Sequence, residues 1–307
     1  MQIKHLVISG GGQTMFQSLG AIQYLEQNGL INFNNLTSIY GTSAGAIVSV
    51  FISLKYDWET LNEYVIKRPW HKVFSIKANT ILDSYSKKGL FDNSVVEKCF
   101  KPLFDAKNIP MEITMKQFFE YNGIEIHMFS FELNSFEGVD ISYKTHPDLL
   151  LIKAIHMTSS FPVFLSPVLI ENKCYIDGGI ICNYPLDKCI ETYGNVDEIL
   201  GFNNDYSSQK KESNNKEQNN IITEESSLID FLLGLFIKIV RSMETDTKQQ
   251  KIKNEIMCKA DHISVDVMKK CLYSHEVRQQ LLDSGIDASK EFLKKMDELK
   301  EDENKKK

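Results

Sequence analysis

Residues 38–54 have the sequence SIYGTSAGAIVSVFISL, and this stretch decides the fold. Its first residues, 38–40 (SIY), favour a short strand. Residues 46–54 are apolar apart from two serines, which is typical of a buried helix. Between them, residues 41–45 (GTSAG) match the G-x-S-x-G pattern of a sharp strand-to-helix turn. The stretch therefore predicts a strand, a tight turn and a helix in direct succession.

An earlier segment has the same order of elements. Residues 3–8 (IKHLVI) favour a strand, three glycines follow at 10–12, and residues 16–28 have the periodicity of a helix that ends at Gly29. Two such units in succession are typical of parallel sheets, in which the turns meet at one edge. We therefore expect a three-layer α/β sandwich with a central, mostly parallel sheet.

The rest of the chain adds elements to this core. Residues 56–122 favour helices and are expected to form an insertion, and a further helix is expected at 149–158. Further strands are expected at residues 125–132, 140–144, 168–170, 174–176 and 198–202.

The composition changes sharply after residue 202. Residues 203–227 are rich in Asn, Ser, Lys, Gln and Glu, which predicts a polar mobile loop. Residues 228–240 (LIDFLLGLFIKIV) are strongly apolar; a charged helix is expected to continue to about Cys258, and a strand to follow at 262–267. The expected parts are a core at 1–202, the polar loop at 203–227, a helical part at 228–297 that completes the domain, and a charged tail at 298–307.

Composition and charge restrict the class of protein. The net charge is −6 and there is no basic stripe, which argues against a nucleic-acid partner. The six cysteines contain no C-x-x-C pair, so we expect neither a metal nor a cofactor. The N-terminal apolar run is short for a signal peptide, and no stretch reaches the roughly 18 apolar residues of a membrane span. A cytoplasmic protein is expected.

Ser43 is the candidate nucleophile. In a G-x-S-x-G turn the serine hydroxyl stands above the sheet, and Gly41 and Gly45 leave the space that a tight turn requires. The N-terminus of the following helix favours negative charge that develops beside it. The pentapeptide also arises by chance in glycine-rich turns, so this interpretation depends on further elements.

Gly10, Gly11 and Gly12 are the candidate oxyanion hole. Three glycines between a strand and a helix expose successive N–H groups, which suits either an oxyanion or a phosphate. The run does not match G-x-G-x-x-G and no G-K-[ST] follows, which disfavours a nucleotide.

Asp177 is the candidate base. It follows a predicted strand and precedes Gly178 and Gly179. Locally, the Asp-Gly-Gly run is also typical of a plain turn. Its place after a strand, far from Ser43 in the sequence, favours a partner that approaches Ser43 in space.

These three motifs, in this order, resemble those of the patatin-like phospholipase family. Residues 158–162 (TSSFP), with Pro167 beyond, look like the small-residue and proline segment that precedes the family's catalytic Asp. The likeness covers about residues 3–202 and resumes from 260 to 295.

The resemblance implies a Ser–Asp dyad that hydrolyses fatty-acyl esters of lipids. Ser43 is then the nucleophile, Asp177 the base, and the amides around Gly11 and Gly12 the oxyanion hole. The substrate implied is a phospholipid or another acyl ester.

The first motif departs from the family pattern. The family commonly has Asp where this chain has Ser9, and Arg or Lys followed by Gly where it has Thr14 and Met15. The lost cation removes a charge near the expected oxyanion site, whereas backbone donors do not depend on side-chain identity.

Two questions stay open at this stage. A buried carboxylate with a raised pKa can activate serine, but a triad using His262 or His275 is an alternative to the dyad. The same dyad would also serve an acyltransferase or thioesterase, and a non-catalytic lipid-binding protein is a further alternative.

Residues 228–240 are expected either to pack over the core or to contact a membrane surface transiently.

Overall fold

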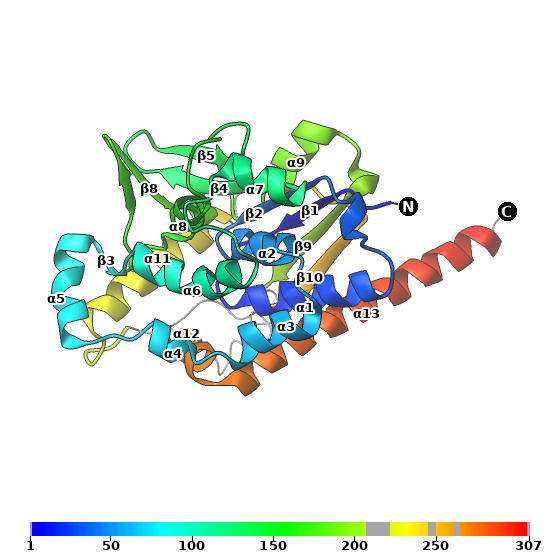
Figure 1. Cartoon of the computed structure of the whole chain (residues 1–307). Coiled ribbons are helices and arrows are strands. Elements are labelled where there is room, and N and C mark those ends of the chain that lie inside the picture. Colours follow the sequence, from blue (N-terminus) through cyan, green and yellow to red (C-terminus); the bar gives the residue numbers. More distant parts are fainter. Residues whose placement is uncertain (1, 207–221, 245–249, 261–264, 306–307) are drawn as a thin grey trace.

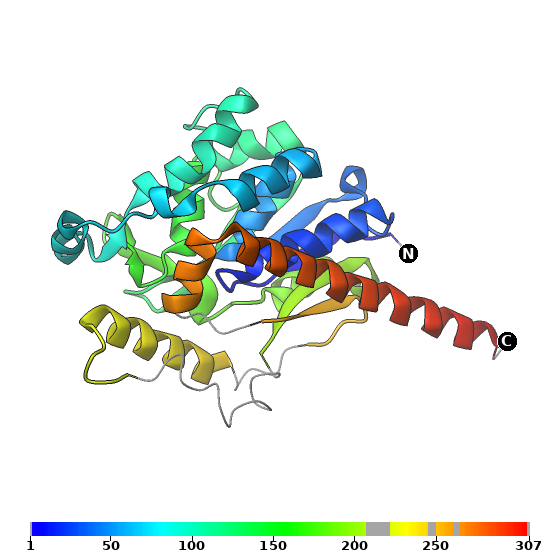
Figure 2. The same cartoon turned by 90° about the horizontal axis from the view of Figure 1, so that it is seen from below.

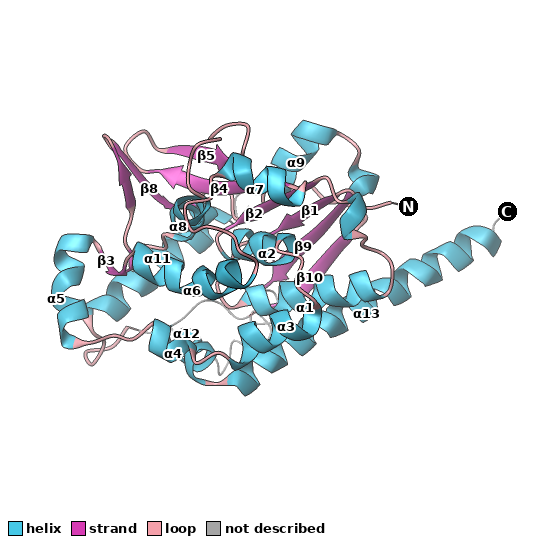
Figure 3. Cartoon of the chain, in the orientation of Figure 1, coloured by secondary structure: helices cyan, strands magenta, loops and turns pink. Residues whose placement is uncertain are grey.

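The computed structural model describes residues 2–206, 222–244, 250–260 and 265–305. In this part of the chain a sheet of eight strands lies between layers of helices (Figures 1 and 3), which confirms the expected three-layer α/β sandwich. The strands of the sheet are β1 (His5–Ile8), β2 (Ser38–Thr42), β4 (Glu125–Glu132), β5 (Glu137–Ile141), β7 (Val168–Ile170), β8 (Lys173–Asp177), β9 (Ile199–Asp205) and β10 (Glu255–Lys259). A separate two-stranded sheet pairs β3 (Gly89–Phe91) with β6 (Val163–Leu165).

Helices surround the two sheets and connect their strands. They are α1 (Thr14–Gln27), α2 (Ala44–Ser53), α3 (Trp58–Asn62), α4 (Trp70–Val73), α5 (Ala78–Lys87), α6 (Asn93–Ala106), α7 (Met115–Asn122), α8 (Leu151–Ser159), α9 (Leu186–Tyr193), α11 (Leu228–Glu244), α12 (Val265–Tyr273) and α13 (His275–Lys305). Single helical turns are η1 (Phe33–Asn35), η2 (Glu63–Lys67), η3 (Gly178–Ile180) and η4 (Val196–Glu198). Residues 56–122 therefore hold α3 to α7.

Strand order and register bring distant residues to one level of the sheet. The order is β10-β9-β1-β2-β4-β8-β7, with β10, β9, β1, β2 and β4 parallel and β8 antiparallel to β4. Thr42 of β2 pairs with Phe129 of β4, and the next residue of β4, Ser130, pairs with Asp177 of β8. Ser43 and Asp177 therefore lie at the same level on the two sides of β4.

The side chains of the inner strands alternate between two apolar layers. Leu6 and Ile8 of β1 belong to the large cluster that α1, α2 and α13 cover, while Val7 belongs to a smaller cluster against α9. Because both faces of the sheet are covered, every residue of the central strands β1, β2 and β4 is buried. Figure 2 shows α13 lying along α1, far from it in sequence.

The C-terminal part differs from the expectation. Helix α11 ends at Glu244, and residues 255–259 form strand β10, which adds a parallel edge to β9. The expected strand at 262–267 is wrong, because helix α12 begins at Val265; residues 261–264 lie outside the described part. Only alternate residues of β10 are buried, as suits an edge strand, and its charged flanks favoured a helix in the sequence.

The predicted polar loop and the predicted charged tail both begin within regular elements. Strand β9 continues to Asp205, and most of the predicted loop, residues 207–221, lies outside the described part. Helix α13 continues through the predicted charged tail to Lys305.

Candidate active site

Ser43 sits in the turn between β2 and α2 with backbone angles that serine rarely adopts. Its φ is 52° and its ψ is −117°. A Cβ on Gly45 would lie 2.2 Å from the carbonyl oxygen of Ile8, and one on Gly41 would lie 2.6 Å from the Gly45 carbonyl carbon. The turn is thus compressed between β1, β2 and the start of α2, and the flanking glycines are needed for this close approach.

Contacts from two other segments hold this strained turn. The Ser43 N–H donates to Thr158 Oγ1 at 2.9 Å, and that hydroxyl donates to the carbonyl of Phe129 at 2.5 Å. Thr42 Oγ1 donates to the carbonyl of Cys182 at 2.6 Å. Strained backbone persists only where neighbouring contacts determine it, as these do.

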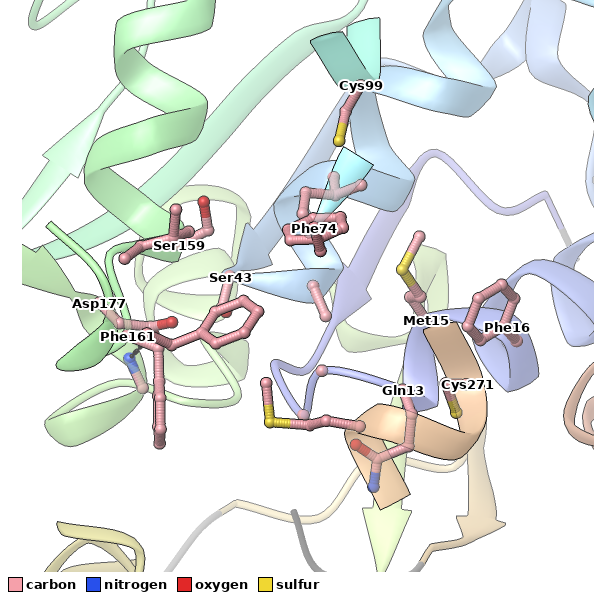
Figure 4. A pocket seen from close by; sticks show the side chains of 18 of the residues that line it. Gln13, Met15, Phe16, Ser43, Phe74, Cys99, Ser159, Phe161, Asp177 and Cys271 are labelled. Carbon is pink, nitrogen blue, oxygen red and sulfur yellow. Dashed lines mark hydrogen bonds between the residues drawn. The ribbon is translucent and has the colours of Figure 1, made fainter. Parts of the chain in front are cut away.

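Asp177 ends strand β8 beside the serine. Its side chain is 3% exposed, its N–H donates to the Ser160 carbonyl at 3.0 Å, and its Oδ1 accepts from the Gly179 N–H at 2.8 Å. Burial raises the pKa of its carboxyl to about 6, although hydrogen bonds with Ser43 and the Gly179 amide act in the opposite direction. Figure 4 shows the two side chains next to each other.

The three glycines after β1 have different surroundings. The Gly10 N–H donates to the Asn183 carbonyl at 2.9 Å, so it is already used, and Gly10 does not line the cavity. Gly11 and Gly12 do line it, with φ of 151° and 60°, and no described residue accepts from their amides. Of the three expected oxyanion-hole amides, those of Gly11 and Gly12 are thus without an acceptor among the described residues, whereas the Gly10 amide is hydrogen-bonded to Asn183.

Sequence reasoning did not assign roles to Thr158 and Asn183. Thr158 lies in the TSSFP segment quoted above, but nothing local marked it as the acceptor of the Ser43 amide. Asn183 follows Asp177 by six positions, lines the cavity, and its carbonyl takes the Gly10 amide. A polar residue shortly after Asp-Gly-Gly was the available signal.

A cavity of about 300 Å³ opens in front of Ser43 and Asp177 (Figure 4). Apart from a few polar groups near these two residues, apolar and aromatic side chains line it. Such a site suits a mainly apolar ligand with one polar group to be oriented.

The positions that depart from the family pattern lie beside this cavity. Met15 lines it, and Thr14 is buried as the first residue of α1, next to Gly11. Ser9 is buried as well.

No histidine lines the cavity within the described part of the chain. The side chain of His275 is 63% exposed and pairs with Glu276 at 3.0 Å, while His262 lies outside the described residues. Nor do three His, Cys, Asp or Glu side chains of that part gather as ligands for a metal ion. None of its helices has the length and apolar character needed to span a bilayer.

Comparison with known proteins identifies relatives of this chain. The sequence model described as patatin-like phospholipase matches residues 6–190. A "probable lipid hydrolase 463L" of Invertebrate iridescent virus 6 is 27% identical over 190 residues, which are 61% of this chain and 63% of that protein. The uncharacterized protein R571 of Acanthamoeba polyphaga mimivirus is 30% identical over 213 residues, 64% of this chain and 67% of that protein. The match thus spans about two thirds of the length of these relatives.

One solved structure shares the fold. VipD from Legionella pneumophila superposes with a TM-score of 0.56 at 17% identity, covering 96% of this chain and 67% of that one.

Proposed function

The chain belongs to the patatin-like phospholipase family, and from this premise we propose that it hydrolyses fatty-acyl esters of lipids with Ser43 as nucleophile and Asp177 as base. The observation that carries the proposal is the hydrogen bond between Ser43 and a buried carboxyl at the mouth of an apolar cavity. Gly11 and Gly12, whose amides have no acceptor among the described residues, line the same cavity.

The proposed reaction has two halves. The Ser43 hydroxyl gives its proton to Asp177 as its oxygen attacks the ester carbonyl carbon, and the amides of Gly11 and Gly12 hold the oxyanion. The C–O bond to the alcohol then breaks, the alcohol takes the proton from Asp177, and an acyl-serine remains. Water then gives a proton to Asp177 and attacks the acyl carbon, and Asp177 passes this proton to the Ser43 oxygen as the fatty acid leaves, which restores both residues.

This role for Asp177 predicts a defined pH profile. The base acts in its ionised form, and its pKa is raised to about 6 by burial. We therefore expect kcat/KM for a soluble ester to be level above that pH and to fall about tenfold per pH unit below it. Measurement between about pH 4.5 and 8 tests this, with protein stability followed in parallel; a profile that stays level down to the lower limit would contradict it.

A covalent probe tests the proposed function directly. We expect a fluorophosphonate to label the wild type and not Ser43→Ala, and the wild type alone to release fatty acid from a panel of phospholipids and neutral lipids. Adding an acceptor alcohol to the same assay separates hydrolysis from acyl transfer. A folded wild type that neither reacts with the probe nor cleaves any ester would exclude the proposal.

We further propose that α11 rests on the membrane surface that supplies the substrate. The inner face of α11 reaches the cavity, because Phe236 and Ile237 line that cavity. The ring of Phe236 packs against the ring of Phe161, with their centroids 5.1 Å apart. The outer face of α11 has five exposed apolar side chains, at Leu228, Phe231, Leu232, Leu235 and Ile239. A helix with an apolar outer face suits the interface of a bilayer.

A single charge on this face tests the contact. We expect Leu235→Asp to weaken binding to phosphatidylcholine vesicles about tenfold, because burying a leucine side chain contributes roughly 1.5 kcal/mol or more. Leu299→Asp is the matched control: Leu235 is 46% and Leu299 56% exposed, and Leu299 lies near the C-terminal end of α13. Equal loss of vesicle binding in both variants, or in neither, would argue against α11 as the contact.

A further inference from the structure

The cavity follows one face of α2 away from the nucleophile. Ser43, Ala44, Ile47 and Phe51 all line it, and the steps of four residues from Ser43 to Ile47 and from Ile47 to Phe51 place these three on one side of the helix. At a rise of 1.5 Å per residue, Phe51 lies about 12 Å along the helix from Ser43. The cavity is therefore elongated along α2, and we call this elongated part, from Ser43 to Phe51, the channel.

Burial differs between the two ends of this channel. Near the nucleophile its walls include the half-buried side chains of Phe161, Ile180 and Phe236. At the other end, Phe51 is 2% and Phe100 1% exposed, and their ring centroids lie 5.3 Å apart. We call the end beside Ser43, with these half-buried side chains, the open end, and the end at the deeply buried Phe51 and Phe100 the closed end.

Other contacts keep the closed end in place. Val65, 1% exposed, also lines the channel, and its carbonyl accepts from Trp70 Nε1 at 2.8 Å. The Phe100 ring packs edge-on against Phe104, which is fully buried and does not line the channel. Densely packed rings of this kind move little, so inserting a further methylene group against them is energetically unfavourable.

We propose that the Phe51–Phe100 pair is the end stop that sets the longest acyl chain accepted on Ser43. This inference rests on the proposed ester hydrolysis and adds the chain length to it. The carbonyl lies at Ser43, the acyl chain extends along α2, and its terminal methyl meets the two rings after about 12 Å. The alcohol of the ester leaves through the open end.

A series of para-nitrophenyl esters from butanoate to tetradecanoate tests the end stop. In the wild type we expect kcat/KM to rise about fourfold per methylene, as apolar surface is buried, until the chain reaches the rings. Beyond that limit, kcat/KM should no longer rise. The chain length at which the rise stops is the quantity compared between variants, because it does not depend on the fraction of folded enzyme.

Three variants separate the end stop from general damage to the core. Phe100→Leu should move the limit to longer chains, and Ile47→Phe, which narrows the channel midway, should move it to shorter ones. Phe104→Leu removes the same atoms from the neighbouring core position and should leave the limit in place. If Phe100→Leu does not fold, the chain-length limit of Ile47→Phe is compared with that of Phe104→Leu. A shorter limit in Ile47→Phe alone then supports the end stop.

The outcomes separate this inference from the proposed function. If esters are cleaved through Ser43 but kcat/KM rises without a limit, or if Phe100→Leu and Phe104→Leu share the wild-type limit, the end stop is wrong and the hydrolase stands. If no ester in the series is cleaved by folded wild type, both are wrong.

Discussion

Replacing Asp177 with asparagine is expected to lower kcat/KM for ester hydrolysis by about 10³-fold or more. Asparagine has the same shape, and its oxygen can still accept from the Gly179 N–H, but it cannot take the proton of Ser43. The loss should appear in kcat, since the lining of the cavity is otherwise unchanged. Initial rates over a range of ester concentrations measure it.

The stability of this variant is its internal control. Burial raises the pKa of Asp177 to about 6 from 3.8, so the ionised form is disfavoured in the folded protein. For a carboxyl with a raised pKa, folding stability is highest below the unfolded pKa and falls as pH rises from about 3.8 to about 6. At neutral pH the charge therefore costs on the order of 3 kcal/mol, with the opposing hydrogen bonds from Ser43 and Gly179 already included in the raised pKa.

We accordingly expect Asp177→Asn to melt at or above the wild-type temperature at pH 7, while being nearly inactive. An inactive variant that melts lower would point to misfolding instead. Full activity in Asp177→Asn, together with loss of activity in His262→Ala or His275→Ala, would replace the dyad by a triad.

Gly45→Ala is expected to destabilise the protein strongly. The added Cβ would lie 2.2 Å from the Ile8 carbonyl oxygen and 2.8 Å from its carbon, both backbone atoms of a buried strand. Because β1 cannot move without disturbing its pairs on both sides, the strain should cost about 3 kcal/mol or more, which lowers Tm by roughly 5 °C or more in a chain of this size. Thermal melting followed by circular dichroism measures the change.

Gly138→Ala is the matched control for this substitution. The nearest atom to a Cβ on Gly138 is 4.0 Å away, so its Tm should change little. Wild-type stability and activity in Gly45→Ala would mean that α2 does not approach β1 as closely as described.

Local patterns were sufficient for the core of the fold. Mostly apolar runs bounded by glycines correctly predicted β1, β2 and the helices that follow, because strands covered on both faces are buried at successive positions. The same reasoning failed at β10, where only alternate residues are buried and charged neighbours favoured a helix. An edge strand is defined by the strand with which it pairs. The local sequence does not specify that pairing strand.

The site shows the same division. The tight turn around Ser43 could be predicted from the sequence, since only glycines fit at positions 41 and 45. The order of the three motifs in the sequence indicated Asp177. Tertiary structure alone decided which groups meet: the register of β4 with β2 and β8 sets Ser43 level with Asp177, and packing against Asn183 removes Gly10 from the set of free amides. It also decided the raised pKa of Asp177 and the closed end at Phe51 and Phe100. Burial and hydrogen-bond partners depend on segments distant in the chain, so no local pattern can specify them.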